Sequence, residues 1–407
     1  MPVETFENPF RPGAGHRPPY LAGRTLETAE FRKLLKQNVI LENLVLTGLQ
    51  GVGKTVLLEH LKPQAIQDGW LWVGTDLSEA ASISETNLAE RLLTDLSVVT
   101  RAIQIGASET FAPGFGTTAT THPEMLTYGR LHALYSETPG LVADKLKAVL
   151  IAVAPVIKAT GKRGIVFAYD EAQNLSDHAS KDQFPLSLLL EVFQSIQRQD
   201  VPFMLALVGL PTLFPKLVEA RTYAERMFRV VFLKKLNFSE TREAITKPIS
   251  TAQCPVKFDD QAVRLVYDHS GGYPYFIQFM CREIYDTYLQ IMEQGIHPSV
   301  PFEEIIRKLD NDFFAGRWAK VTDRQQQLLY VIANLENAER EFTIQEVATA
   351  SSEFLEKPFS RSHVSQMVTS FIFAGLVYKD RHGKYLFAVP LMGAFIKRAM
   401  ANQGYIG

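Results

Sequence analysis

The stretch GLQGVGKT, residues 48–55, determines how the rest of this 407-residue chain is interpreted. It matches G-x-x-x-x-G-K-[ST], the loop that wraps the phosphates of a nucleoside triphosphate. A short apolar run precedes it at 43–48, and residues with helical spacing follow it at 56–62. Strand, glycine loop and helix therefore occur in the order that this loop requires.

Each residue type in the loop has a physical reason. We expect Gly48, Gly51 and Gly53 to adopt positive φ and to let the backbone approach phosphates closely. The loop amides then form an anion-binding nest at a helix N-terminus. Lys54 can reach the β- and γ-phosphates, and the Thr55 hydroxyl can bind Mg²⁺. The predicted nucleotide contacts in this segment are Gly48, Gln50, Gly51, Val52, Gly53, Lys54, Thr55 and Val56.

The composition is ordinary for a globular protein, with 46% hydrophobic and 21% charged residues, and the length predicts two or three domains. A net charge of -2 predicts no global attraction to nucleic acid or to an anionic membrane. Cys254 and Cys281 give neither a disulfide framework nor metal-site spacing. Residues 1–13 lack the apolar core of a signal peptide, and the longest apolar run, 148–157, is too short for a bilayer. We expect a cytoplasmic protein without a membrane partner.

Short apolar runs alternate with helical segments over the first half of the chain. This alternation predicts an α/β fold with a mainly parallel, five-stranded sheet and helices on both faces. The predicted strands are 43–48, 70–77, 164–171, 202–209 and 229–236.

Residues 106–121 interrupt this pattern because they are small, polar and rich in glycine. They predict a mobile loop, which is either a contact for a substrate or a subunit or a disordered insertion. We expect helix to resume over 123–160.

Two adjacent carboxylates follow the third predicted strand. Asp170 and Glu171 come at the carboxyl end of an apolar run, where ligands bind in open α/β sheets. We expect Asp170 to hold Mg²⁺, directly or through water, and Glu171 to polarise the attacking water. Together with Lys54, these residues predict a hydrolase that acts on a nucleoside triphosphate.

Five segments carry a family resemblance: PFRPGAGHRPPYLAGR (9–24), GLQGVGKT (48–55), AYDEAQ (168–173), LVGLPTL (207–213) and GGYPY (271–275). Together they resemble the AAA+ ATPases, and more narrowly the origin-recognition-like and STAND-like branch found in bacteria and archaea. The resemblance covers about residues 9–290. It implies ATP as the nucleotide, and no guanine-specific N-K-x-D run is apparent in the sequence.

The resemblance also implies roles for residues outside the phosphate loop. Tyr20 and Arg24 would lie near the adenine. Tyr273 and Pro274 would belong to a lid that closes over the base and the phosphates.

In AAA+ assemblies an arginine from one subunit completes the neighbouring site and stabilises charge in the transition state. Arg221, Arg226 and Arg229 lie in the corresponding segment, and we expect Arg226 to have this catalytic role in a homo-oligomer. The alternative is a surface arginine that pairs with Glu225 or Glu219.

Two positions depart from the family pattern. The fourth strand ends in GLPT, 209–212, where a polar sensor such as Asn is usual, and Thr212 is the candidate replacement. The lid motif has no arginine at the usual sensor position, and Arg282 lies too far along the chain. Both departures predict slow hydrolysis and a switch rather than a fast motor.

The C-terminal segment has the pattern of a winged helix, with three helices at 322–335, 343–350 and 360–373 and two strands at 375–379 and 384–388. Its third helix could enter the major groove of duplex DNA. Basic residues barely outnumber acidic ones here, so protein docking is the alternative role. The candidate DNA contacts are Arg361, Ser362, His363, Ser365, Gln366, Lys379, Arg381 and Lys384.

Two functions follow from these predictions. The first is an ATP-binding, slowly hydrolysing assembly switch that associates with DNA through its winged helix. The second is a STAND-type signalling ATPase that recruits a protein effector and binds no nucleic acid. The predicted domains are 1–24 (extended segment), 25–236 (ATPase domain), 237–300 (helical lid) and 301–407 (winged helix).

Overall fold

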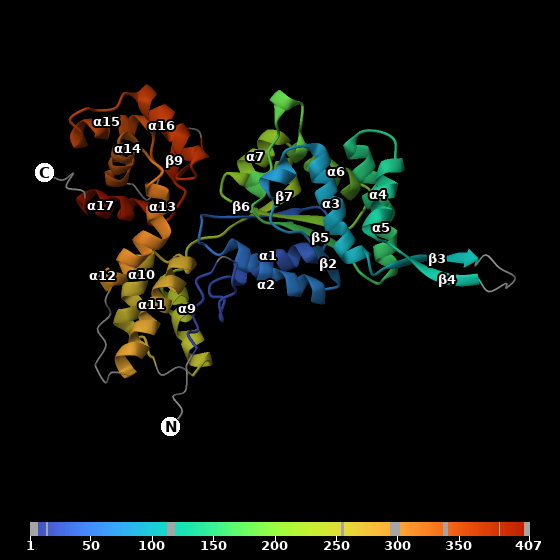
Figure 1. Cartoon of the computed structure of the whole chain (residues 1–407), viewed down its shortest axis with the longest axis horizontal. Helices are drawn as coiled ribbons and strands as arrows, with labels where there is room; N and C mark the ends of the chain where they lie inside the picture. The colour runs from blue at the N-terminus through green and yellow to red at the C-terminus, as the bar shows by residue number, and fades with distance from the viewer. Residues whose placement is uncertain are drawn as a thin grey trace. The chain divides into compact units, whose positions relative to one another are not determined.

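The computed structural model of the chain describes residues 7–13, 15–111, 119–253, 256–293, 302–336, 341–381 and 383–402 (Figure 1). The chain divides into two compact units. The α/β unit comprises Thr25–Thr47 and Leu57–Phe232, and the helical unit comprises Met1–Arg24, Gly48–Val56 and Leu233–Gly407. None of the helices within the described ranges is both long and apolar enough to cross a bilayer.

A five-stranded parallel sheet lies in the middle of the α/β unit, which confirms the predicted fold class. The central strand β6 pairs with β1 on one side and with β5 on the other. Because all strands are parallel, their carboxyl ends meet at one edge of the sheet. In spatial order the strands are β2 (Trp70–Val73), β5 (Gly164–Tyr169), β6 (Phe203–Gly209), β1 (Asn43–Thr47) and β7 (Phe228–Phe232).

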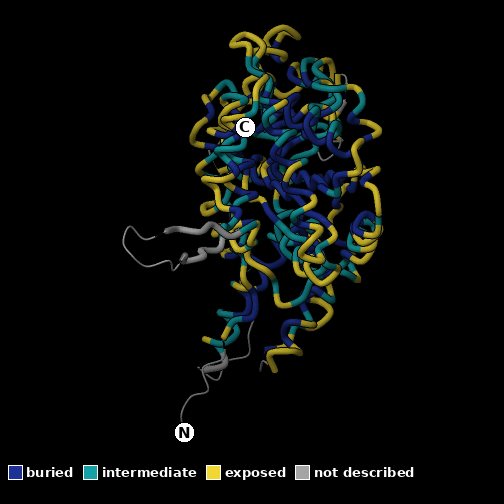
Figure 2. Tube along the Cα trace, turned by 90° about the vertical axis from the view of Figure 1, so that its right-hand side faces the viewer, coloured by how far each residue is buried: buried dark blue, intermediate teal, exposed yellow. Residues whose placement is uncertain are grey.

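Helices cover both faces of this sheet (Figure 1). On one face α1 packs beside β2, where Trp70 Nε1 donates a hydrogen bond of 3.1 Å to the carbonyl of Leu35. On the other face α3, α5 and α6 bury apolar side chains against β5 and β6. These two strands are buried along their whole length, and buried segments run through the middle of the trace in Figure 2. The helices are α1 (Thr25–Leu35), α2 (Lys54–Gln67), α3 (Glu85–Thr100), α4 (Tyr128–Glu137), α5 (Val142–Ala159), α6 (Pro185–Gln197), α7 (Leu213–Ala220) and α8 (Ala224–Met227).

The predicted loop at 106–121 is wrong for the described residues on both sides of it. β3 (Gln104–Phe111) and β4 (Ala119–Met125) form an antiparallel ladder that extends beyond the helices of the α/β unit (Figure 1). Threonine and phenylalanine in these segments favour strands, and the ladder satisfies their backbone polar groups. The glycines and the proline that suggested a loop are concentrated in 112–118, outside the described residues. Consequently helix resumes at Tyr128 and not at 123.

Three helices follow the sheet in the helical unit, in the segment predicted as a lid. They are α9 (Phe238–Thr251), α10 (Asp260–Ser270) and α11 (Pro274–Glu293). α9 begins with a capping box in which the Asn237 side chain accepts from the Glu240 amide at 2.9 Å and the Glu240 carboxylate accepts from the Asn237 amide at 2.8 Å. The N-terminal segment packs on α11 through Phe10, whose ring lies 6.4 Å from that of Tyr285.

The rest of the helical unit contains the three helices and the hairpin that the sequence predicts. A π-helical turn, Asp310–Phe314, connects α12 to α13 ahead of them. Thr322 and Thr343 begin two of the helices with capping boxes. The elements are α12 (Phe302–Leu309), α13 (Ala315–Trp318), α14 (Asp323–Asn334), α15 (Ile344–Phe354), α16 (Arg361–Phe373), β8 (Val377–Arg381), β9 (Lys384–Phe387) and α17 (Met392–Asn402).

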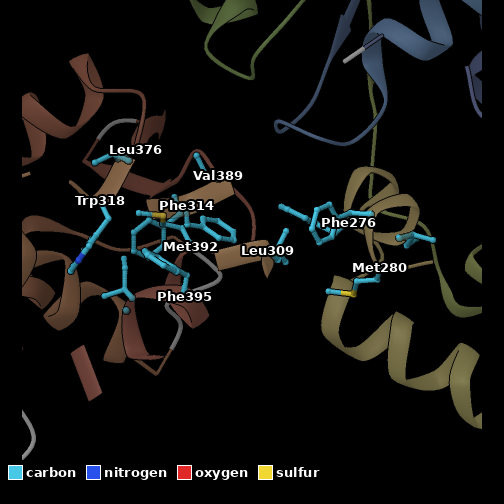
Figure 3. Packing of buried hydrophobic residues seen from close by; sticks show 14 of the residues in the cluster. Phe276, Met280, Leu309, Phe314, Trp318, Leu376, Val389, Met392 and Phe395 are labelled. Atoms are coloured by element: carbon cyan, nitrogen blue, oxygen red, sulfur yellow. The ribbon is translucent and has the colours of Figure 1, made fainter. Parts of the chain in front are cut away.

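Aromatic rings connect the lid helices with this C-terminal part in one buried cluster. Phe276 in α11 lies 6.1 Å from Phe314 in the π-helical turn. Phe314 in turn stacks on Phe395 of α17, with ring centres 5.0 Å apart. Phe314, Met392 and Phe395 gather in one group in Figure 3. The cluster therefore fixes the π-helical turn relative to both α11 and α17.

Candidate nucleotide-binding site

The phosphate loop belongs to the helical unit, and its glycines have two different structural roles. Gly51 and Gly53 have φ of 76° and 92°, a region in which residues with a Cβ are strained. Gly48 does not have the positive φ that we predicted for it. A Cβ on Gly48 would instead lie 2.8 Å from the carbonyl oxygen of Leu233 and 3.0 Å from Val52 Cγ1. Gly48 is therefore required for close packing and not for its backbone conformation.

Lys54 and Thr55 begin helix α2 directly after the loop. The Lys54 ammonium donates hydrogen bonds of 3.0 and 3.1 Å to the carbonyls of Gly48 and Leu49, so its side chain turns back over the loop. The Thr55 side chain lies beside the N-terminal segment, since a Cβ on Gly15 would be 3.5 Å from its methyl group. Among the other predicted contacts, the side chain of Val52 is buried and that of Gln50 is exposed.

The first turn of α11, in the segment predicted as a lid, contacts the loop through one backbone hydrogen bond. The amide of Tyr275 donates to the carbonyl of Gly51 at 3.1 Å. Pro274, a predicted site residue, is the first residue of α11 and fixes the direction of this turn. The preceding Gly272 has a φ of 78°, and a Cβ there would lie 2.2 Å from the carbonyl oxygen of Leu236. The sequence analysis singled out Tyr273 and Pro274 and missed Tyr275.

The two residues predicted to lie near the adenine make contacts within the helical unit. Arg24 is buried, and its guanidinium donates to the carbonyls of Val52 at 2.9 Å and of Lys234 at 3.0 Å. It thereby holds the phosphate loop against the segment that leads into α9. Tyr20 donates a hydrogen bond of 2.9 Å to Glu243, and this bond raises the pKa of the Tyr20 hydroxyl.

The adjacent carboxylates lie in the α/β unit, at the carboxyl end of β5. Asp170 is buried, its carboxylate accepts from the amide of Glu171 at 2.8 Å, and its carbonyl accepts from the amide of Leu77 at 2.9 Å. Glu171 is exposed and has a φ of 51°. For a residue with a Cβ this conformation costs about 1–3 kcal/mol, and such strain is typical of functional sites.

A residue that the sequence analysis missed, Gln173, connects Glu171 to the end of β6. Its side-chain amide donates to the Glu171 carboxylate, and its oxygen accepts from the amide of Leu210 at 3.1 Å. Its own carbonyl accepts from the ammonium of Lys216 at 2.6 Å, and burial lowers the pKa of this lysine. Gln173 thus contacts the end of β6, near the position of Thr212, and no side-chain hydrogen bond of Thr212 occurs in the described part of the chain.

The three candidate arginines differ in their partners. Nε and Nη2 of Arg229 donate to the same carboxylate oxygen of Glu30, at 3.0 and 2.8 Å. The guanidinium of Arg221 lies 3.8 Å from the carboxylate of Glu191. Arg226 is exposed on α8 and forms no ion pair with any described residue, so the predicted alternative pairing with Glu225 or Glu219 is not observed.

Arg226 also borders a hollow of about 440 Å³ in the α/β unit. Val39 and Leu41, which line this hollow, are exposed by 38% and 74% respectively, although both are apolar. An unpaired cation beside exposed apolar side chains is an arrangement that suits a protein–protein contact.

The candidate DNA contacts lie mostly on one helix of the helical unit. Five of them are exposed on α16, Lys379 is exposed on β8, and Lys384 is half-buried on β9. The side chain of Arg381 lies outside the described part of the structure. The five on α16 are Arg361, Ser362, His363, Ser365 and Gln366.

Solved structures share this fold over nearly the whole chain. The Walker-type ATPase of Pyrococcus abyssi is similar with a TM-score of 0.57 and 13% identity, covering 94% of this chain and 97% of that one. The chain therefore shares its fold with this Walker-type ATPase. The ADP form of the ORC2 protein of Aeropyrum pernix is similar with a TM-score of 0.54 and 15% identity, covering 97% and 98%. The predicted resemblance in fold to the origin-recognition-like branch is thereby confirmed.

Sequence comparison adds one match. Residues 311–396 match a family described as a domain of unknown function (DUF8462). No curated protein matches this sequence.

Proposed function

We propose that the chain is an AAA+ ATPase that binds ATP with Mg²⁺ and hydrolyses it slowly. The change from the ATP-bound to the ADP-bound form would switch its assembly with other copies. The contact of the lid with the phosphate loop, from the Tyr275 amide to the Gly51 carbonyl, supports this proposal best. A lid that touches the loop itself responds to phosphates held by the loop amides. The ORC2 protein, which has the same fold, is named as an ADP form.

The chain's own residues suit the metal and the reaction. Mg²⁺ prefers oxygen ligands, and Thr55 and Asp170 offer a hydroxyl and a carboxylate. When bound, Mg²⁺ would neutralise charge on the β- and γ-phosphates. Lys54 would bind the same phosphates, and Glu171 would orient and polarise the attacking water. Gln173 would hold the Glu171 carboxylate in place from the end of β6.

Assembly through Arg226 is part of the same proposal. The side chain is exposed, has no ion-pair partner in the described ranges and borders the hollow next to Leu41. Arg226 would complete the ATP site of a neighbouring copy and stabilise the negative charge of the transition state.

Size-exclusion chromatography with ADP and with a non-hydrolysable ATP analogue tests the switch directly. We expect a larger species with the analogue than with ADP. Identical elution with both nucleotides, at concentrations that saturate binding, would contradict an assembly switch.

We further propose that the exposed face of α16 contacts duplex DNA. Polar and basic side chains, including Arg361 and Gln366, are exposed along this helix. The alternative, a protein effector, is favoured by Phe373, which is 88% exposed at the end of the same helix.

The salt dependence of binding to a DNA duplex distinguishes DNA binding from recruitment of a protein effector. DNA binding predicts that log K falls with log salt concentration, and that Arg361→Ala with Lys379→Ala reduces the slope by about 2. Lys397→Ala, an exposed lysine on α17, is the matched control. Two results together would favour the protein effector instead of DNA. The chain would bind no duplex at low salt, and Phe373→Ala would abolish the function of the protein in cells.

A further inference from the structure

A cation from the C-terminal part of the helical unit contacts the phosphate loop. Arg317, in α13, donates a long hydrogen bond of 3.4 Å from Nη2 to the side-chain oxygen of Gln50. Its Nη1 donates to the carbonyl of Phe313 at 2.7 Å, and its guanidinium lies 4.7 Å from the centre of the Phe313 ring. The loop and Arg317 both belong to the helical unit, although 267 positions separate Gln50 from Arg317 in the sequence.

The position of Arg317 is fixed by the aromatic cluster that also holds the lid. The Phe313 ring, on which the guanidinium rests, lies 5.2 Å from that of Tyr275, the residue whose amide binds Gly51. The π-helical turn that supplies Phe313 adds a residue to the helical repeat and so changes the direction of the side chains after it. Such turns are frequent at functional sites.

Arg317 has no carboxylate partner among the described residues. Neighbouring cations do have one: Arg398 binds Asp310 at 2.8 and 2.6 Å, and Lys308 binds Glu283 at 2.7 Å. Burial and Asp312 raise the pKa of the Tyr275 hydroxyl, and the charge of Arg317 opposes them. A half-buried guanidinium without a counter-charge favours an anionic ligand.

In the described part of α11, no cation makes a hydrogen bond to the loop. The first turn of this helix begins with Pro274, Tyr275 and Phe276. Arg282 is exposed farther along α11, where its carbonyl accepts from Asn8 at 3.0 Å. Arg317 reaches the loop from outside the lid helix.

The contact with Gln50 lies next to the loop residues that Lys54 binds. The Lys54 ammonium binds the carbonyls of Gly48 and Leu49, directly before Gln50 in the loop. The lysine of this loop type reaches the β- and γ-phosphates. Arg317 thus approaches the loop beside the segment to which the lysine is bound.

We propose that Arg317 binds the terminal phosphate of ATP and makes the chain prefer ATP to ADP. The inference rests on the proposed ATP binding. It places a positioning residue for the nucleotide in the segment that matches the DUF8462 family.

Titration of wild type, Arg317→Ala and Arg317→Lys with ADP and with a non-hydrolysable ATP analogue tests the proposal. Loss of a charge-assisted hydrogen bond should weaken analogue binding by about tenfold or more in Arg317→Ala, with ADP affinity within about twofold of wild type. Arg317→Lys should recover part of the loss. Gln50→Ala should weaken analogue binding less, because the charge remains.

Arg324→Ala is the matched control. Arg324 also rests on an aromatic ring, 4.0 Å from the centre of Phe359, and also donates to a backbone carbonyl, that of Lys357. It should bind both nucleotides as wild type does. Equal losses for analogue and ADP in Arg317→Ala, or no loss for either, would overturn the inference. Absence of nucleotide binding by the wild type would instead refute the proposed function on which the inference rests.

Discussion

The amide of Tyr275 donates a hydrogen bond of 3.1 Å to the carbonyl of Gly51. Through it the first turn of α11, the predicted lid helix, contacts the predicted phosphate loop, from which it is separated by more than two hundred residues. The approach is close, since a Cβ on Gly51 would lie 3.2 Å from Tyr275 Cβ. The conformation of the loop and the position of the lid therefore depend on each other.

We expect Gly51→Ala to weaken ATP binding by about tenfold or more, because it disturbs the loop amides and the Tyr275 bond, each worth about 1 kcal/mol. The alanine also strains a φ of 76°, which lowers the free energy of unfolding by about 1–2 kcal/mol. Gly161→Ala is the matched control, since its φ is 77° and its added Cβ meets nothing within 4 Å. It should lower stability similarly and leave ATP affinity unchanged in calorimetric titration. Wild-type affinity in Gly51→Ala would contradict the coupling.

Glu171→Gln should retain ATP binding and reduce the hydrolysis rate by about 10²–10⁴, as expected when a general base is lost. The substitution keeps the size of the side chain and removes its negative charge. Steady-state phosphate release, measured together with ATP affinity, checks both parts. Turnover at the wild-type rate would show that Glu171 is not the base.

Gln173→Ala should lower kcat with little change in KM, because Gln173 donates to the Glu171 carboxylate and is not among the residues that we expect to hold the nucleotide. Gln199→Ala is a suitable control, since its exposed side chain donates to the Ser195 carbonyl in the last turn of α6. A Gln173→Ala variant in which KM rises and kcat stays constant would contradict the positioning role.

Arg226→Ala should reduce hydrolysis only at protein concentrations at which copies associate. Arg229→Ala, which removes an arginine that is already paired with Glu30, should not show this dependence. Activity is measured over a protein dilution series with saturating ATP. Equal loss in a dilute monomer would indicate that Arg226 acts within its own chain.

Local sequence patterns predicted much of the fold. The apolar runs ending at Gly48 and Glu171 correspond to β1 and β5, and the glycine loop stands between strand and helix as expected. These features were predictable because burial and turn chemistry act over a few residues. The ladder of β3 with β4 was missed because its small, polar residues resemble a loop when they are considered without their strand partner.

Each residue that the sequence analysis missed makes a contact with a residue far away in the sequence. The importance of Gln173 becomes visible only from its contact with Leu210 at the end of β6. That of Arg317 becomes visible only from its contact with Gln50. Tyr275 contacts the loop through its backbone amide, and the type of its side chain does not predict such a contact. For Gly48 the residue type was correct and the reason was wrong, since packing against Leu233 explains it better than φ does.

The central claim is that the loop at 48–55 captures a nucleoside triphosphate through its amides and Lys54. Isothermal titration with ATP and Mg²⁺ tests it most directly, with Lys54→Ala as the comparison. We expect about one ATP bound per wild-type chain and a loss of affinity of at least about tenfold in Lys54→Ala, because a charge-assisted phosphate contact is removed. A wild-type chain that binds no ATP, or a Lys54→Ala variant with wild-type affinity, would contradict the account.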